Sequence, residues 1–377
     1  MIRDLHVERV RGFGHFELHD LGQVNLLVGT NNSGKTTVLE SLQMLSAPGD
    51  IAAIYRILFR RGEDFYDAGE RGRMIRYVDL RRLFHGHEIR LGSRFDVVAT
   101  TTTGVRKFSA SIVEAPPPAD GPQRQQLFEP DPGQVESDDL GAPLAVRLTW
   151  DEMAAADYLI TLSSKGGISF EGIRRSSYAL ETGIGKSPLI TAASLNSDAV
   201  VELFEAIVLT PEEDLVVEAL KIIEPSIERI ATGRTERVRN SSEAARGGIL
   251  VRCKGVDNRI PIGSMGDGTW RMLGLALTLV RSANCVLLVD EIDTGLHFSV
   301  MADIWRLIYK TAKRLNVQVF ATTHSRDCFE SLAVICREQV GENSDITIQR
   351  IERGKKMAVG YTEREIIAAS RRGMEVR

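Results

Sequence analysis

A glycine-rich loop directly after an apolar run is the feature that most constrains the fold of this chain. The run is Val24–Val28, and the loop, Gly29–Thr36, reads Gly-Thr-Asn-Asn-Ser-Gly-Lys-Thr. This G-x-x-x-x-G-K-[ST] spacing is typical of a phosphate-binding loop between a strand and a helix. Its glycines let backbone N–H groups approach phosphates, its lysine reaches the β- and γ-phosphates, and its last hydroxyl helps to hold Mg²⁺. We therefore predict a nucleoside triphosphate site, followed by a helix over residues 35–45 whose N-terminus faces the same anion.

The expected contacts to the nucleotide are consecutive residues of this loop and helix. They are Asn31, Asn32, Ser33, Gly34, Lys35, Thr36 and Thr37. Lys35 is expected to act in catalysis by neutralising phosphate charge, and Thr36 to bind the metal ion. A glycine-rich turn that matches by chance is the alternative. It is disfavoured because every fixed position fits between a strand-like and a helix-like segment.

A second apolar run, far downstream, ends in two acids. The run is Cys285–Val289, and Asp290 and Glu291 follow it, as in a Walker B strand. Asp290 is expected to hold Mg²⁺ directly or through water, and Glu291 to orient and deprotonate the attacking water, because phosphoryl transfer depends on positioning and charge neutralisation. An acidic pair alone often only solvates a strand end. The catalytic interpretation therefore depends on the phosphate-binding loop upstream.

Three further segments surround these acids. A glycine-rich turn at 263–269 precedes them and opens an apolar helix that runs to about residue 280. The run Ile-Asp-Thr-Gly-Leu-His follows at 292–297, before a segment with an apolar stripe typical of a helix. The stripe consists of Met301, Ile304, Trp305, Ile308, Tyr309, Ala312 and Leu315. A strand-like segment, 317–325, then places His324 near its end.

The order of these motifs resembles the ABC-type ATPase superfamily, in which Walker A is followed by a long insertion, a signature loop, Walker B, a D-loop and a switch histidine. The strand Val-Glu-Arg-Val-Arg-Gly-Phe at 7–13, the loop Asn-Asn-Ser-Gly-Lys-Thr and the run Glu-Ile-Asp-Thr-Gly-Leu-His are similar to the SMC and recombination-repair branch. The chain most resembles the ATPase heads of overcoming-lysogenization-defect (OLD) proteins and related bacterial anti-phage ATPases. The likeness covers about residues 1–45 and 200–377.

This resemblance implies an α/β P-loop fold with an antiparallel β-subdomain and a helical insertion, and ATP and Mg²⁺ as ligands. It also implies that two heads sandwich two ATP molecules, so that the chain forms a homodimer or higher oligomer through its ATP sites. Ser264, Gly266 and Gly268 would then contact the γ-phosphate of the partner's ATP. Asp293 would communicate across the dimer, and His324 would sense the γ-phosphate as a catalytic residue. A strand-end histidine bonded to the backbone is the alternative for His324.

Two features depart from the family pattern. Met265 stands where the signature serine is expected if Gly266 is aligned, and Asp267 adds a carboxylate near a phosphate. The trans contact of the signature loop therefore stays open. No residue matches the Q-loop, because Gln43 lies on the helix after the phosphate-binding loop and the next glutamines, at 123, 125 and 126, lie in a linker.

Composition divides the chain into three parts. Residues 1–114 are predicted to form an N-terminal ATPase lobe, with a helical segment over 51–87 and antiparallel strands over 88–114. Residues 115–143 are rich in proline and poor in apolar residues, as in a flexible linker or loop. Residues 144–377 hold the insertion and the C-terminal ATPase lobe, with helices expected to start at Pro211 and Pro225. Since no heptad repeat is sustained, we expect no long coiled coil.

The overall composition is that of a globular cytoplasmic enzyme. The 377 residues are 43% hydrophobic, which is sufficient for a large core. The four cysteines lack C-x-x-C spacing, as expected in a reducing compartment. No apolar run approaches the ~18 residues that span a bilayer, so we expect no membrane partner. The net charge of −4 gives no global basic field of the kind a dedicated nucleic-acid binder has.

These features favour an ATP hydrolase that dimerises through its nucleotide sites and switches a separate effector protein in prokaryotic anti-phage defence. The alternative is a DNA repair or recombination ATPase that clamps DNA directly. A transporter cassette fits less well, because the signature and Q-loop are atypical and the insertion is long. No nuclease activity is expected from this chain. Only a short segment follows His324, and its acids, Glu352, Glu363 and Glu365 among them, are interleaved with bases.

Nucleic-acid binding stays open at a cluster of arginines between residues 56 and 94. They either contact phosphates or form internal ion pairs with the acids interspersed among them. The cluster consists of Arg56, Arg60, Arg61, Arg71, Arg73, Arg76, Arg81, Arg82, Arg90 and Arg94.

Overall fold

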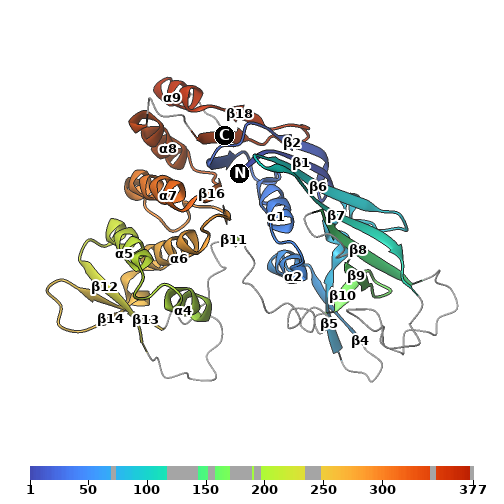
Figure 1. The fold of residues 1–377 in the computed structure, drawn as a ribbon, viewed down its shortest axis with the longest axis horizontal. Coiled ribbons are helices and arrows are strands. Elements are labelled where there is room, and N and C mark those ends of the chain that lie inside the picture. The colour runs from blue at the N-terminus through green and yellow to red at the C-terminus, as the bar shows by residue number, and fades with distance from the viewer. Residues whose placement is uncertain are drawn as a thin grey trace.

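A computed structural model describes residues 1–68, 74–116, 143–151, 158–169, 189–190, 197–233, 248–339 and 345–373. Most of the predicted linker at 115–143, as well as Arg71 and Arg73, lies outside these ranges. The fold is mixed α/β, as predicted, and is built around one mainly parallel sheet and one antiparallel sheet (Figure 1).

The parallel sheet carries both nucleotide motifs. Its strand order is β11 (Leu189–Ile190), β15 (Val286–Val289), β16 (Gln318–Thr322), β3 (Val24–Val28), β17 (Ile346–Arg350) and β18 (Val359–Tyr361). All neighbours pair in parallel except β17 and β18. The carboxyl ends of β3, β15 and β16 therefore lie at the same edge of the sheet, where the loops after them converge.

The antiparallel sheet confirms the predicted β-subdomain and includes the N-terminal strand. Its order is β2 (Phe13–Leu18), β1 (Ile2–Val10), β6 (Arg94–Thr101), β7 (Gly104–Glu114), β8 (Leu144–Trp150) and β9 (Tyr158–Thr161). Both predicted lobes contribute to this sheet, since β8 and β9 follow the linker and pair with β7 and with each other. The lobe boundaries at 114 and 144 stay a prediction.

The two sheets and the helices enclose two hydrophobic cores. Strand residues alternate between them, because successive side chains of a strand point to opposite faces. Leu27, Leu288 and Phe320 pack with α1 (Lys35–Leu45), α2 (Ile51–Arg60) and the antiparallel sheet. Their neighbours Leu26, Leu287 and Val319 pack on the other side, with α4 to α8. Figure 1 shows α1 and α2 against the antiparallel sheet and α4 to α7 on the opposite side.

The remaining helices and the small sheet lie on the second side, and the 3₁₀ turns are divided between the two sides. The helices are α4 (Ser197–Glu205), α5 (Pro211–Ile223), α6 (Asp267–Arg281), α7 (Met301–Leu315), α8 (Arg326–Glu338) and α9 (Glu363–Arg371). The 3₁₀ turns are η1 (Leu80–Leu83), η2 (His85–His87), η3 (Ile262–Met265) and η4 (Phe298–Val300). The small sheet has the order β12 (Ile227–Thr232), β13 (Ile249–Cys253) and β14 (Ile260–Pro261).

Two helix predictions, the apolar stripe at 301–315 and the helix start at Pro211, are confirmed. The stripe of α7 is buried, with Leu315 partly buried at its end, and Pro211 begins α5. The predicted helix start at Pro225 is wrong, because the chain enters β12 there and pairs with β13, a partner more than 15 residues away. In the described part of the chain the longest helices, α6 and α7, have 15 residues, so no long coiled coil is present there.

The helical prediction for residues 51–87 is correct only for α2 and the short 3₁₀ turns. Residues 64–68 and 74–79 instead form β4 (Asp64–Ala68) and β5 (Met74–Asp79), which pair with each other, and β5 also pairs with β10 (Gly167–Ser169). Phe65 and Tyr77 stack across the strands with ring centroids 5.5 Å apart. Pairing with a distant segment decided the structure here, and a local pattern cannot show such pairing.

None of the described helices is long and apolar enough to cross a membrane.

Candidate nucleotide site

The loop Gly29–Thr36 has the backbone that a phosphate-binding loop requires. Gly29 and Gly34 have φ angles of 146° and 108°, which favour glycine. A Cβ atom at Gly29 would overlap the carbonyl oxygen of Ile351, and one at Gly34 would overlap the ring of Phe13. Gly34 is also the N-cap of α1, so the first N–H groups of that helix point toward the loop.

The predicted nucleotide contacts differ in exposure. Asn31 and Asn32 are exposed at the tip of the loop, whereas Ser33, Lys35 and Thr37 are buried. The Ser33 Oγ atom is buried without a hydrogen-bond partner among the described residues. Since buried hydroxyls are normally hydrogen-bonded, this atom fits a loop that closes on the oxygens of a bound phosphate.

The Lys35 ammonium lies at the mouth of the loop. Its Nζ donates hydrogen bonds to the carbonyl oxygens of Gly29 and Thr30, both at 2.8 Å. Burial lowers the pKa of Lys35, while the charges of Asp290 and Glu291 oppose this shift. The two Walker B acids are thus close enough to act on the lysine of Walker A. The structure brings together these residues, which lie more than 250 positions apart in the sequence.

Thr36 and Asp290 provide oxygen atoms that suit Mg²⁺. The Thr36 Oγ1 atom lies 3.2 Å from Asp290 Oδ2 and 3.4 Å from Oδ1. Two oxygens at this separation are within reach of one small cation with metal–oxygen distances of about 2.1 Å. Mg²⁺ commonly takes one or two protein oxygens and completes its shell with phosphates and water. The donor set therefore fits the predicted metal.

Glu291 is held at three points. Its backbone N–H donates to Thr322 Oγ1 at 2.8 Å, and its carbonyl accepts from Arg271 Nη2 at 2.9 Å. Its carboxylate accepts from Thr294 Oγ1 at 3.2 Å. The φ angle of Glu291 is 51°, an uncommon value for a residue other than glycine. Strain of this kind persists only where the surroundings enforce it, and it clusters at functional sites.

His324 follows β16 and faces the same acid. Its Nε2 atom lies 3.7 Å from Glu291 Oε1, and both side chains are partly exposed. The imidazole and the carboxylate therefore lie side by side at the edge of the sheet. This placement agrees with the position expected for a γ-phosphate sensor, and the sensing role itself stays a prediction.

The D-loop and signature residues lie next to each other in the same chain. Asp293 Oδ1 accepts a hydrogen bond from Thr323 Oγ1 at 2.6 Å. Gly266 is the N-cap of α6 with φ 93°, and the helix begins at Asp267, within the predicted glycine-rich turn at 263–269. A Cβ atom at Gly268 would lie 3.2 Å from the carbonyl oxygen of Gly295 in the D-loop. Ser264 is exposed in η3, just before this helix.

A buried ion-pair network lies under the phosphate-binding helix. Arg11 pairs with Glu40 of α1 at 2.7 Å and forms two hydrogen bonds with Glu63, at 2.7 and 2.9 Å. Glu40 also accepts from Arg61, at 2.6 Å through Nε. Because Glu40 lies one helical turn after Thr36, the network ties the N-terminal half of α1 to the turn between β1 and β2.

The arginine cluster is largely committed to internal ion pairs. The described pairs are Arg56–Asp50, Arg61–Glu40, Arg76–Asp64, Arg81–Asp79, Arg82–Asp79, Arg90–Glu88 and Arg94–Asp96. Burial opposes ionisation of Asp96, but hydrogen bonds from Arg94, Ser109 and Lys107 lower its pKa to about 2. This pattern favours the ion-pair alternative over a free phosphate-binding surface.

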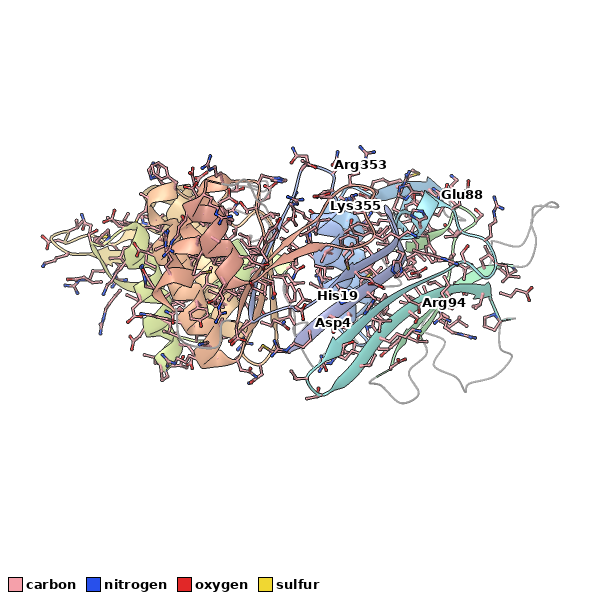
Figure 2. The ribbon with its side chains drawn as sticks, turned by 90° about the horizontal axis from the view of Figure 1, so that it is seen from above. Asp4, His19, Glu88, Arg94, Arg353 and Lys355 are labelled. Atoms are coloured by element: carbon pink, nitrogen blue, oxygen red, sulfur yellow. The ribbon has the colours of Figure 1, made fainter. Side chains whose placement is uncertain are left out.

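A ladder of acids and histidines covers the outer face of β1 and β2. Its three cross-strand rungs are Asp4–His19, His6–Glu17 and Glu8–His15, and Figure 2 shows Asp4 and His19 next to each other. His15 has one ring nitrogen 2.8 Å from Glu8 and the other 2.9 Å from Glu17. Both nitrogens donate only in the charged imidazolium. Among the described residues no group of three or more His, Cys, Asp or Glu side chains is arranged to hold a metal ion, so this ladder is not such a site.

Sequence reasoning missed several residues around the nucleotide motifs. Thr322, Thr323, Thr294 and Arg271 all contact Walker B or D-loop residues, and Phe13 covers Gly34. One signal was present, since two adjacent threonines, Thr322 at the end of β16 and Thr323 after it, follow the apolar residues 319–321. Arg271 and Phe13 gave none, because their contacts depend on helix and strand packing.

Comparison with known proteins finds an ATPase-domain model over part of the chain. Residues 213–327 match a family described as "AAA domain, putative AbiEii toxin, Type IV TA system". This stretch includes α5, the signature region, Walker B and His324, but not the phosphate-binding loop.

Two curated proteins match short segments. An ATP/GTP phosphatase of Helicobacter pylori is 31% identical over 98 residues, which cover 24% of this chain and 25% of that protein. An uncharacterized protein of Methanocaldococcus jannaschii is 37% identical over 59 residues, 15% of this chain and 27% of that protein. The chain thus spans about a quarter of the length of each curated relative.

Solved structures of SMC heads align along nearly the whole chain, but weakly. An SMC head bound to the C-terminal winged-helix domain of ScpA has a TM-score of 0.48 at 13% identity, covering 96% of this chain and 98% of that one. The SMC head of Thermotoga maritima has a TM-score of 0.43 at 11% identity, with the same coverage. At such scores these structures support no inference about activity or partners. The comparisons therefore show that residues 213–327 are similar to an AAA-type ATPase domain, and the ABC superfamily and its branch stay a resemblance.

Proposed function

We propose that this chain binds ATP with Mg²⁺ and hydrolyses it. One observation carries the proposal: the oxygens of Thr36 and Asp290 lie 3.2 Å apart, although they come from two motifs at opposite ends of the chain. Lys35 would neutralise the β- and γ-phosphates, Thr36 and Asp290 would hold the metal ion, and Glu291 would activate the attacking water. The matched ATPase domain and the ATP/GTP phosphatase relative support this activity.

The test separates binding from chemistry. Lys35→Ala should weaken ATP binding, whereas Glu291→Gln should bind ATP and lose at least about 100-fold in turnover, because it removes only the general base. Glu330→Gln is the matched control, since Glu330 is an exposed acid paired with Arg326 on α8. Hydrolysis by Glu291→Gln at the rate of the unmodified protein would show that another group activates the water.

We further infer that ATP joins two copies of the chain, each completing the other's site. The exposed loop at Ser264 and Gly266 supports this, because it leads into the exposed N-terminus of α6, and helix N-termini attract phosphate. Glu291→Gln protein should associate on addition of ATP, as measured by light scattering. Gly266→Arg mixed with Lys35→Ala should recover part of the activity through one intact composite site, and a fully active monomer would contradict this.

For the biological role, we propose that ATP turnover switches a separate effector in prokaryotic anti-phage defence. The resemblance to OLD-type heads and the description of the matched family, which names a toxin–antitoxin system, support this role. Purification from the native cell with Glu291→Gln should capture the effector together with the protein. The purified chain with ATP and Mg²⁺ or Mn²⁺ should leave DNA intact. ATP-dependent DNA binding by the isolated chain would instead favour the repair ATPase.

A further inference from the structure

Thr322 ends β16, the strand that lies between the two nucleotide motifs. Its side chain is completely buried, with 0% of its surface exposed. Its Oγ1 atom donates to Asp290 Oδ1 at 2.6 Å and accepts from the backbone N–H of Glu291 at 2.8 Å. We propose that Thr322 is a positioning residue that fixes Asp290 and Glu291 in one geometry, so that metal binding and water activation are aligned.

The chemistry of the hydroxyl fixes the direction of both hydrogen bonds. A threonine hydroxyl has one proton to donate, and an ionised carboxylate can only accept. The proton must therefore lie toward Asp290, which leaves the oxygen lone pairs for the amide of Glu291. The Thr36 Oγ1 atom lies 3.2 Å from Asp290 Oδ2 and 3.4 Å from Oδ1. Thr322 thus anchors the carboxylate through Oδ1, while both oxygens stay near Thr36.

The same residue holds the strained turn after β15. The backbone carbonyl of Thr322 accepts from the N–H of Ile292 at 3.0 Å, so Thr322 contacts three successive residues of that turn. The next residue, Thr323, continues the series by binding Asp293. The positive φ angle of Glu291 lies in the middle of this segment. Such a conformation is unfavourable for a residue other than glycine and needs surroundings that enforce it.

This inference rests on the proposed ATP hydrolysis and assigns a role to a residue that would not itself touch ATP. Its buried hydroxyl already has two partners, so it acts through Asp290 and Glu291. A purely structural role would give a different result. If the role were purely structural, loss of the hydroxyl would leave the backbone N–H of Glu291 without its partner and lower the stability of the fold. The Mg²⁺ dependence of ATP hydrolysis would then stay unchanged.

The experiment compares Thr322→Val, Thr322→Ser and a control, Thr278→Val. Valine keeps the shape and removes the hydroxyl, and serine keeps the hydroxyl. Thr278 is a buried threonine of α6 whose hydroxyl donates to the carbonyl oxygen of Gly274 at 2.8 Å, in the middle of a helix. Thr278→Val therefore removes a buried threonine hydroxyl, as Thr322→Val does, but at a residue that does not contact Asp290 or Glu291.

Two readouts are measured for each variant. The first is kcat with its dependence on Mg²⁺ concentration. The second, in a Glu291→Gln background, is the affinity for a fluorescent ATP analogue with Mg²⁺ and with EDTA. Thr322→Val should lower kcat between about 10- and 100-fold, a range typical of small misplacements of catalytic groups. It should also shift the Mg²⁺ requirement upward and weaken binding only when Mg²⁺ is present. Thr322→Ser should keep most of the kcat and of the Mg²⁺ dependence of the unmodified protein. Thr278→Val should change neither kcat nor the Mg²⁺ dependence.

Three results would overturn the inference: Thr322→Val with unchanged kcat and Mg²⁺ dependence, Thr322→Ser no better than Thr322→Val, or Thr278→Val with an equal loss. If Thr322→Val does not fold, Thr322→Ser and Thr322→Ala are compared in the same assays, with thermal melting as the folding check. Failure of the proposed function would look different. In that case the unmodified protein would not hydrolyse ATP, or Glu291→Gln would retain full turnover.

Discussion

Arg11 offers a direct test of how the buried ion-pair network stabilises the phosphate-binding helix. Its side chain is only 5% exposed and lies between Glu40, at 3%, and Glu63, at 18%. Burial favours the neutral form of Arg11, but hydrogen bonds and charges from Glu63 and Glu40 outweigh this and raise its pKa. Arg11→Met removes the cation, keeps an apolar stem of similar length and leaves both carboxylates in place.

The magnitude follows from what happens to those carboxylates. Removing one partner of a buried ion pair typically costs 3–5 kcal/mol, because the other charge stays buried without compensation. Here Glu40 keeps Arg61 and Glu63 reaches water, so we expect the lower end, about 3 kcal/mol. An unfolding entropy of about 2.1 cal/mol/K per residue gives about 0.8 kcal/mol/K for 377 residues. The apparent Tm should therefore fall by about 4 °C.

Thermal unfolding followed by circular dichroism measures this shift. The control is Arg326→Met, because Arg326 is 56% exposed and pairs with Glu330 one helical turn away. Such a surface pair contributes about 0.3–0.5 kcal/mol to stability, so the Tm of Arg326→Met should fall by less than about 1 °C. Arg11→Lys should lie between the two, since lysine keeps the charge but cannot form the two-point contact with Glu63. Equal shifts for Arg11→Met and Arg326→Met would refute the reasoning.

Three more predictions follow from single residues. Gly34→Ala should abolish ATP binding in a filter assay, because φ is 108° and the new methyl group would overlap Phe13; tight binding would contradict the loop geometry. A thiol reagent at pH 8 should modify Cys285 first, since the other three cysteines are buried and burial raises the pKa of Cys336 to about 12. Mass spectrometry of the labelled peptides checks the order. Hydrogen bonding to Glu8, and less to Glu17, raises the pKa of His15 above 6.5. The stabilisation by charged His15 is complete below the pKa that His15 has in the unfolded chain, and it is lost as pH rises through the higher pKa of the folded protein. The Tm should therefore fall as pH rises from 6 to 8.5, and it should fall less in His15→Gln.

The nucleotide motifs could be predicted from the sequence because each is a local arrangement. Gly29, Gly34, Lys35 and Thr36 need a fixed spacing along the chain, and the φ angles of the two glycines are set within the loop itself. The apolar strand before Asp290 and the buried stripe of α7 are likewise visible as short-range patterns. These patterns were sufficient to predict an α/β fold and the order in which the nucleotide motifs follow one another along the chain.

The spatial relations within the site depended on tertiary structure. The parallel sheet places β16 between β15 and β3, and only this order brings Thr322 to Asp290 and Glu291. The spacing between these segments in the sequence carries no information about which strands become neighbours. The same holds for β5, which lies between β4 and the distant β10 and pairs with both.

The fate of the arginines shows the same division between sequence and fold. The sequence shows a cluster of bases with acids interspersed, and it leaves open whether the cations face a phosphate or a neighbouring acid. Folding decided this for Arg61 and Arg76, since it placed Glu40 beside Arg61 and Asp64 within 2.7 Å of Arg76. Attraction between charges weakens with distance. The partners of these two arginines are therefore set by the three-dimensional arrangement of the strands and helices, which no count of bases along the chain contains.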